Sequence, residues 1–176
     1  MAVPSPWTLR DGRSVTVRRA VPDDAQRILE HVNRVAAEGV YIMTERLRHS
    51  LEEEREILRG FDGQAGLFLV ALVADELVAT ADFRRGAQAK NAHTASLGIA
   101  IRKELRGLGL GRAMLEEGIR WARSVGIRKL TLGVFATNEP AIRLYRSLGF
   151  VEEGRLRGQV ILGGIPVDEL LMALWT

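Results

Sequence analysis

The sequence predicts an α+β fold built on a mixed, mostly antiparallel sheet, and three features indicate it. Segments with strand and helix patterns follow each other irregularly along the 176 residues, unlike the regular repeat of a doubly wound fold. Two apolar segments, 67–74 and 77–84, flank Asp75-Glu76 and predict an antiparallel hairpin. The stretch 93–135 has the strand–helix–strand order of a single parallel crossover.

Composition limits the class of protein. The hydrophobic fraction of 47% is enough for one sizeable core, and we expect residues 1–176 to form a single domain with its core at about 14–175. No apolar run approaches the roughly 20 residues that span a bilayer, and the N-terminal segment lacks the apolar stretch of a signal peptide. We therefore expect a cytoplasmic protein without a membrane partner. The absence of cysteine excludes disulfides and a cysteine nucleophile.

Neither a metal nor a nucleic acid is predicted as a partner. The three histidines, His31, His49 and His93, lie far apart in the sequence and lack the spacing of metal ligands. The net charge is +3 and the pI is about 9.8, but the 25 basic residues are scattered among 22 acidic ones. No basic run is interleaved with aromatic residues, as a nucleic-acid surface would require.

The N-terminal half predicts one strand, two helices and the hairpin. An Asp-Gly turn precedes a segment of alternating apolar residues, which is typical of a strand. The first helix opens at Pro22 and keeps helical apolar spacing as far as Glu38, and Ser50 and Glu53 form a capping box for the second helix. These elements are a strand at 14–19, helices at 22–38 and 50–59, and the hairpin strands, with residues 40–49 left unassigned and 85–92 predicted as an exposed turn.

The C-terminal half predicts the crossover, a further helix and a final hairpin. Gly98 within the first strand of this half predicts a bulge. Asn138 is suited to cap a helix that carries Pro140 in its first turn, and Gly149 is suited to end that helix. The expected elements are a strand at 93–101, an amphipathic helix at 113–126, a strand at 129–135, a helix at 138–149 and a hairpin at 160–174.

Residues 106–112, RGLGLGR, place three glycines directly before a helix. A P-loop would need a lysine and a hydroxyl where Arg112 and Ala113 stand, and a dinucleotide fingerprint would need a third glycine where Met114 stands. What remains is a helix N-terminus with free N–H groups between two arginines, which suits a phosphate. On this loop alone, a tight strand-to-helix connection without a ligand is the alternative.

A second motif, N-x-x-A-x-x-x-Y-x-x-x-G-F, runs from Asn138 to Phe150. Together with R-x-x-G-x-G at 106–111, it resembles the GCN5-related N-acetyltransferases (GNAT). Within that family, the final stretch from Leu148 resembles bacterial enzymes that act on free amino acids or small amines, and it is also similar to the polyamine and ribosomal-protein branches. The resemblance implies a strongly twisted sheet with flanking helices, whose central strands, 93–101 and 129–135, splay apart.

The resemblance also implies acetyl-CoA as the cosubstrate, with no metal. The pantetheine arm would lie between the splayed strands and pair with the main chain of the first, and the pyrophosphate would rest on main-chain amides of the glycine loop. Asn138 and Ala141 would border the pantetheine on its other side. The cofactor-binding residues implied in this way are Ile99, Ala100, Ile101, Arg106, Gly107, Leu108, Gly109, Leu110, Gly111, Arg112, Asn138, Ala141 and Tyr145.

The family reaction is the direct attack of an amine on a thioester. Without cysteine the usual route through a thiol acetyl-enzyme is closed, which favours a ternary complex. Tyr145 matches the family's general acid, because a phenol stays protonated at neutral pH; packing of its ring in the core is the alternative. A main-chain N–H near Ile99 would stabilise the oxyanion.

The general base is not evident, because the strand 93–101 contains no glutamate. His93 and Ser96 are weak candidates for substrate contacts or a proton relay, and Glu38 is a weak candidate for binding an ammonium group. An α-amine with a pKa of about 7.7–8.0 suits such a site better than a lysine-type amine with a pKa of about 10.4.

We therefore expect acetylation of a primary amine on a free amino acid or similar small molecule. A protein N-terminus or a polyamine is the alternative acceptor, and a CoA-binding module without turnover is the alternative class. The terminal hairpin is compatible with a homodimer.

Overall fold

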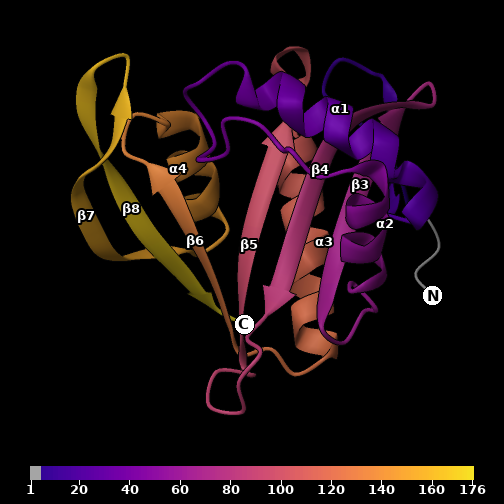
Figure 1. The fold of residues 1–176 in the computed structure, drawn as a ribbon. Helices are drawn as coiled ribbons and strands as arrows, with labels where there is room; N and C mark the ends of the chain where they lie inside the picture. The colour runs from indigo at the N-terminus through magenta and orange to yellow at the C-terminus, as the bar shows by residue number, and fades with distance from the viewer. Residues whose placement is uncertain (1–4) are drawn as a thin grey trace.

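The computed structural model describes residues 5–176, which form one eight-stranded sheet in the order β1-β2-β3-β4-β5-β6-β8-β7 (Figure 1). Within these residues every neighbouring pair of strands is antiparallel except β5 and β6, so the predicted mixed sheet with one crossover is confirmed. The strands are β1 (Ser5–Thr8), β2 (Ser14–Arg19), β3 (Gly66–Val73), β4 (Glu76–Arg85), β5 (Thr94–Ile101), β6 (Lys129–Phe135), β7 (Val151–Leu162) and β8 (Ile165–Trp175). The helices are α1 (Ala25–Ala36), α2 (Leu51–Arg59), α3 (Leu110–Ser124) and α4 (Glu139–Ser147), with 3₁₀ turns at Pro22–Asp24 and Lys103–Leu105.

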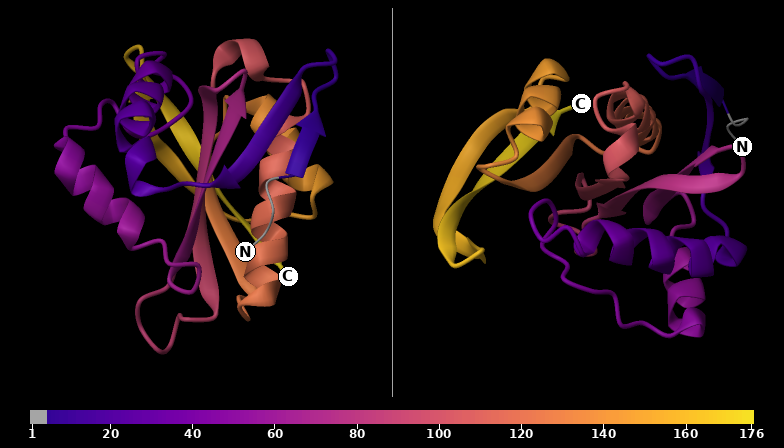
Figure 2. Two further views of the ribbon diagram at one scale, coloured as in Figure 1. Left: turned by 90° about the vertical axis from the view of Figure 1, so that its right-hand side faces the viewer. Right: turned by 90° about the horizontal axis from the view of Figure 1, so that it is seen from above.

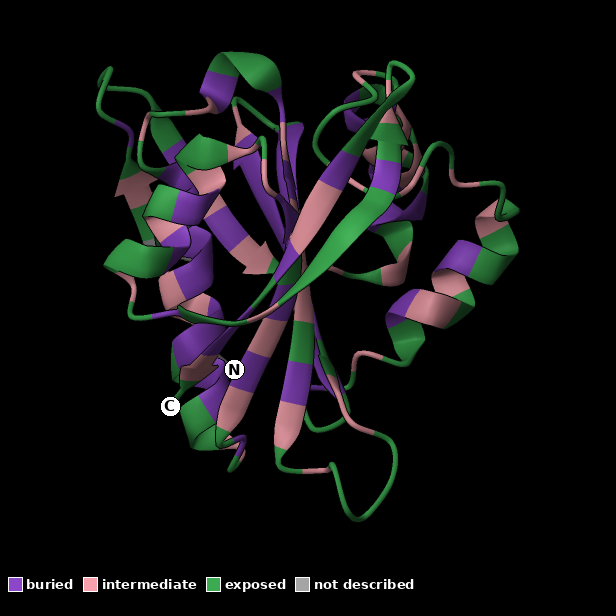
Figure 3. Cartoon of the chain, turned by 90° about the vertical axis from the view of Figure 1, so that its left-hand side faces the viewer, coloured by how far each residue is buried: buried purple, intermediate pink, exposed green. Residues whose placement is uncertain are grey.

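The helices cover both faces of the sheet, with α1 and α2 on one face and α3 and α4 on the other (Figure 2). The sequence of β3 is apolar throughout and does not alternate between apolar and polar residues. Leu67 and Leu69 belong to the core under α3, whereas Phe68 and Val70 pack with α1 and α2. A strand that is buried on both faces carries apolar residues at every position. By contrast, most of β7 is exposed at the edge of the sheet (Figure 3).

Strands β5 and β6 separate soon after they meet. They pair only at Thr94–Lys129, Ala95–Leu130 and Ser96–Thr131, and beyond these residues they diverge (Figure 1). Each strand is held from its other side, β5 by β4 and β6 by β8. The splayed central strands expected from the family resemblance are therefore present.

Two local predictions, the residues of the hairpin turn and the bulge at Gly98, are wrong. The hairpin turn consists of Ala74 and Asp75, because a two-residue turn of this kind needs a positive φ at both positions, and their φ angles are 47° and 64°. Gly98 forms no bulge, since β4 and β5 pair in unbroken register around it. Its small size serves another purpose, because a Cβ there would lie 2.9 Å from Asp82 Oδ1. Strand β1 was not predicted, and β7 begins at Val151, nine residues before the predicted hairpin at 160–174.

No helix within residues 5–176 is both long enough and apolar enough to cross a membrane.

Helix α3 lies close against the sheet at Gly118. A Cβ at this position would overlap the ring of Phe83, which is fully buried in β4. We expect Gly118→Ala to lower the free energy of unfolding by about 1–2 kcal/mol, because the overpacking outweighs the gain in helix propensity. Urea denaturation followed by circular dichroism measures this change.

The control is Arg123→Ala, because the side chain of Arg123 is exposed on the same helix. We expect this substitution to change the free energy of unfolding by less than about 0.5 kcal/mol. A Gly118→Ala variant as stable as the wild type would contradict the close packing of α3 on β4.

Candidate active site

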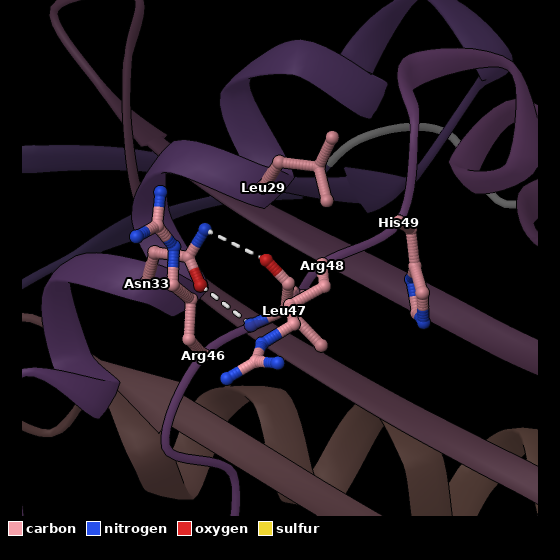
Figure 4. Close-up of a pocket in the computed structure, with 6 residues that line it drawn as sticks. All are labelled: Leu29, Asn33, Arg46, Leu47, Arg48 and His49. Atoms are coloured by element: carbon pink, nitrogen blue, oxygen red, sulfur yellow. Dashed lines mark hydrogen bonds between the residues drawn. The ribbon is translucent and has the colours of Figure 1, made fainter.

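A cavity of about 1150 Å³ opens where β5 and β6 diverge. One wall comes from the glycine loop and α4, and the opposite wall comes from α1, α2 and the segment 41–49. That segment has no regular structure, but Asn33 of α1 holds it in place. The Asn33 side chain accepts a hydrogen bond from Leu47 N at 2.7 Å and donates to Leu47 O at 3.4 Å, beside a smaller cavity of about 490 Å³ (Figure 4).

The glycine loop leads from β5 into α3. Gly109 has a φ of 96°, and nothing lies within 4 Å of its missing side chain. The loop therefore needs glycine here for backbone conformation and not for space. Helix α3 begins at the next residue, three residues earlier than predicted, and no side chain caps it. The N–H groups of its first turn are consequently free to bind an anion.

Basic side chains surround this helix N-terminus. Arg10 reaches the loop through its main chain, which donates to Leu108 O at 3.1 Å, and Arg112 donates to Ser147 Oγ at 2.6 Å. The cations that line the cavity near the loop are Arg10, Lys103, Arg106, Arg112 and Arg143. Their charges favour a ligand with several negative charges at this end of the cavity.

The main chain of β5 is directed alternately toward β4 and toward the gap. Arg102 N donates to Val78 O and Thr94 O accepts from Gly86 N, so the even-numbered residues of β5 face β4. Ala100 therefore directs its main-chain groups toward β4, and Ile99 and Ile101 direct theirs into the gap. Of the three residues predicted to contact a pantetheine arm, these two have the suitable orientation.

His31 of α1 binds β5 at Ala100, from the face of the sheet that carries α1. Its ring is buried, and Nε2 lies 3.1 Å from Ala100 O. Burial lowers the pKa of His31 to about 4, so the ring is neutral at pH 7. Because a carbonyl oxygen can only accept, Nε2 carries the proton and donates it.

Arg106 and Glu38 bind each other. The two Arg106 terminal nitrogens lie 2.7 and 2.6 Å from the Glu38 oxygens, Arg106 Nε donates to Ile101 O at 2.9 Å, and the guanidinium stacks 4.3 Å from the centre of the Tyr41 ring. The hydrogen bonds from Arg106 lower the pKa of Glu38. Both oxygens of Glu38, predicted as an ammonium ligand, are thus engaged by the glycine loop. The pair joins the end of α1 to that loop.

Tyr145 lies in α4 at the cavity wall. Asn138 positions the helix, because its Oδ1 accepts from Ala141 N at 3.4 Å at the N-terminus of α4. Tyr145 is 5% exposed, and its ring packs 5.8 Å from that of Phe150. Burial raises the pKa of Tyr145 to about 12. Its hydroxyl bonds to no other group in the described part of the chain, which leaves it free for a ligand in the cavity.

Other predicted residues lie elsewhere. His93 precedes β5 at the end where the strands meet, and its carbonyl accepts from Arg128 N and Lys129 N. Neither it nor Ser96 lines the cavity. Leu110 is fully buried in the core, so only its main chain can take part in the site. The predicted residues that do line the cavity are Ile99, Ala100, Ile101, Arg106, Gly107, Gly109, Gly111, Arg112, Asn138, Ala141 and Tyr145.

Sequence reasoning missed three carboxylates that line the cavity, Glu54, Asp82 and Glu169. Asp82 faces the gap from β4, and Arg84 Nε donates to its Oδ2 at 2.9 Å. Burial raises the pKa of Asp82, although the guanidinium of Arg84 opposes part of this rise. The sequence did contain a signal, since Asp82 is the one charged residue in the otherwise uncharged stretch 77–83.

No group of three or more potential metal ligands occurs within residues 5–176.

These features define a fold in which a glycine loop and a splayed strand pair share one cavity. The model of the acetyltransferase (GNAT) family matches residues 31–150, and the chain belongs to this family.

Two curated relatives and one solved structure are similar to it. YwnH of Bacillus subtilis is 37% identical over 75 residues, which are 43% of this chain and 46% of YwnH. The L-amino acid N-acetyltransferase AaaT of Escherichia coli is 28% identical over 109 residues, which are 60% of this chain and 65% of AaaT. The matches thus span less than two thirds of either relative. A GNAT-family acetyltransferase from Streptococcus pneumoniae superposes with a TM-score of 0.88 at 28% identity, covering 92% of this chain and 99% of that one.

The pair between Glu38 and Arg106 predicts a pH-dependent contribution to stability. The pKa of Glu38 is lower in the folded state than its ordinary value of 4.5. The ion pair therefore stabilises the fold fully above pH 4.5, and this stabilisation is lost as the pH falls through the lowered pKa. We expect Glu38→Gln to lower the free energy of unfolding by about 1–2 kcal/mol at pH 7 and by progressively less below pH 4.5. Urea titrations over that pH range measure the difference.

Glu139→Gln is the matched control, because the ion pair of Glu139 with Arg143 is exposed. We expect it to change stability by less than about 0.5 kcal/mol at pH 7. An equal effect of the two substitutions would refute a special role for Glu38.

Proposed function

We propose that the chain is an acetyl-CoA-dependent N-acetyltransferase that modifies a primary amine of a small molecule. The observation that supports this most is the shared cavity. It runs from the free N–H groups of α3 to the unpaired main chain of Ile99, and Tyr145 and Asp82 line it as well. Membership of the acetyltransferase family gives this arrangement its chemistry.

The charges and the free main-chain groups of the cavity support one orientation of acetyl-CoA. Its pyrophosphate binds the N–H groups at the start of α3, with additional positive charge from Arg112 and its neighbours. The pantetheine arm then takes the place that a strand beside Ile99 and Ile101 would occupy, and Asn138 and Ala141 border it from α4. This direction brings the thioester to the part of the cavity that Tyr145 lines.

The reaction proceeds by direct attack. The neutral amine nitrogen forms a bond to the thioester carbon, and the main-chain N–H of Ile99 donates to the oxygen that becomes negative. The C–S bond then breaks, the nitrogen releases its extra proton to solvent through a water molecule, and the sulfur leaves as a thiolate. Tyr145 donates a hydrogen bond and then a proton to this sulfur as general acid. The pKa of Tyr145, about 12, exceeds that of a thiol, about 8.5. Tyr145 therefore first stabilises the departing sulfur through the hydrogen bond and transfers its proton afterwards.

Asp82 is the proton acceptor for the incoming ammonium group, directly or through a water molecule. It is a partly buried carboxylate on the strand next to Ile99, and it replaces the glutamate that the first splayed strand lacks. His93 and Ser96, which line no part of the cavity, are weaker candidates.

The proposed acceptor is a free amino acid or a similar small amine. The similarity to a protein named L-amino acid N-acetyltransferase supports this choice. A protein N-terminus or a polyamine is the alternative acceptor. The test is an assay of thiol release from acetyl-CoA with amino acids, polyamines and short peptides. Turnover with small amines supports the proposal, and binding of acetyl-CoA without turnover of any amine would show a binding module instead.

Replacement of Tyr145 tests the role of the hydroxyl. We expect Tyr145→Phe to lower kcat about 10²-fold or more, because the departing thiolate loses its proton donor. Acetyl-CoA affinity, measured by calorimetry, should be unchanged. The chain has one other tyrosine, and Tyr41→Phe is the control because its ring can still stack on Arg106. Unchanged kcat in Tyr145→Phe would exclude Tyr145 as the acid.

The proposed role of Asp82 as proton acceptor predicts how kcat/KM depends on pH at the acidic end of the profile. A proton acceptor must be ionised, so kcat/KM falls as the pH drops through the raised pKa of Asp82. We expect Asp82→Asn to lower kcat/KM at pH 7 by at least about tenfold and to abolish this limb. The control is Asp75→Asn, in the exposed turn of the same hairpin. An unchanged acidic limb in Asp82→Asn would assign the base elsewhere.

A further inference from the structure

Two glycines border the gap on the face of the sheet that carries α1 and α2. Ser96 and Thr131 are direct partners, so Gly98 and Gly133, each two residues further along, lie on the same face. Asp82 shares this face, because it pairs with Gly98 on one side and with Phe68 on the other. Neither strand therefore places a side chain on this face at the first position beyond the last paired residues.

Carboxylates from the outer strands fill the space over both glycines. A Cβ on Gly98 would lie 2.9 Å from Asp82 Oδ1, and a Cβ on Gly133 would collide with Glu169 Oε1. Asp82 comes from β4 and Glu169 from β8, which lie on opposite sides of the gap (Figure 1). The two carboxylates thus enter one cavity from opposite walls.

Glu169 differs from the other carboxylates near the cavity in having no basic side chain bound to it. Asp82 is bound to Arg84 and Glu38 to Arg106, and Glu54 shares a hydrogen bond with the ring of His49. Glu169 forms neither an ion pair nor a side-chain hydrogen bond with any group of residues 5–176, although it is partly buried.

A carboxylate in the cavity wall that has no protein partner is available to form an ion pair with a cationic ligand. The neighbouring carboxylate of Asp168 is not available in this way, since Gly158 N donates to it at 2.9 Å and Arg155 pairs with it at 3.3 Å.

We infer that Glu169 binds a second cationic group of the acceptor, so that the preferred acceptors are small diamines or diamino acids. This inference rests on the proposed function and narrows its substrate class to small amines with a second cationic group, a class that includes the diamines of the polyamine alternative. The amine to be acetylated loses its proton on the wall of Asp82 and Ile99, and the other amine stays protonated against Glu169 across the gap. Phe135, the direct partner of Glu169 in the β6–β8 ladder, also lines the cavity and offers an apolar surface to the connecting methylene groups.

The test compares acceptors that differ only in the second amine. These are 1,4-diaminobutane against 1-aminobutane, and 2,4-diaminobutyrate against 2-aminobutyrate. We expect kcat/KM to be at least about tenfold higher for the diamino member of each pair, carried mainly by KM, as one partly desolvated ion pair would give. In Glu169→Gln this ratio should fall to about one.

Two further variants make the test specific. Asp168→Asn removes the same charge from the adjacent residue of β8 and should keep the ratio of the wild type. Gly133→Ala displaces the Glu169 carboxylate without removing it, so it should also lower the ratio, and the double variant Gly133→Ala, Glu169→Gln should be no worse than Glu169→Gln. Circular dichroism and acetyl-CoA affinity verify that each variant is folded.

The outcomes separate the two proposals. Equal turnover of mono- and diamino acceptors by the wild type would overturn the role of Glu169 and leave the proposed function intact. A ratio that falls equally in Asp168→Asn would also overturn it, because the effect would then come from net charge. Absence of turnover with every amine would overturn the proposed function together with this inference.

Discussion

The site depends on the separation of β5 from β6 after three paired residues. A parallel pair that continued to Ile101 would use the main-chain groups of Ile99 and Ile101 in a ladder, and no cavity would exist. The separation persists because each strand is anchored on its outer side, β5 to β4 and β6 to β8. Unpaired main chain between two fixed strands is costly when it is left unsatisfied, so a ligand that bonds like a strand is favoured there.

The charges of the cavity change sign along its length. Arginines and the start of α3 make the glycine-loop end positive, whereas Asp82, paired with Arg84, and Glu169, without a cation, place carboxylates on the sheet face. Such a division would orient the proposed polyanionic donor and cationic acceptor before they react. The pair between Arg106 and Glu38 holds the glycine-loop end in place, because it links this loop to the end of α1 and to Tyr41.

The sequence predicted what is encoded locally and missed what depends on strand register. The glycine loop, the Asn138 cap and Tyr145 are recognisable because their spacing lies within one loop or one helix. The ion pair of Glu38 and Arg106 joins residues 68 positions apart, so no local pattern reveals it. Gly98 was interpreted as a bulge because a glycine in a strand signals either a kink or a close neighbour. Only the β4–β5 register shows that the neighbour is Asp82.

The two carboxylates of the gap also explain how an amine of high pKa could react here. A lysine-type amine with a pKa of about 10.4 costs roughly 4–5 kcal/mol to deprotonate at pH 7. A second ammonium group held at Glu169 disfavours a like charge nearby and so lowers the pKa of the amine opposite it. Asp82, with a pKa raised by burial, is a better proton acceptor than an exposed aspartate. In the proposed reaction, binding one amine as a cation would therefore help the other to become the nucleophile.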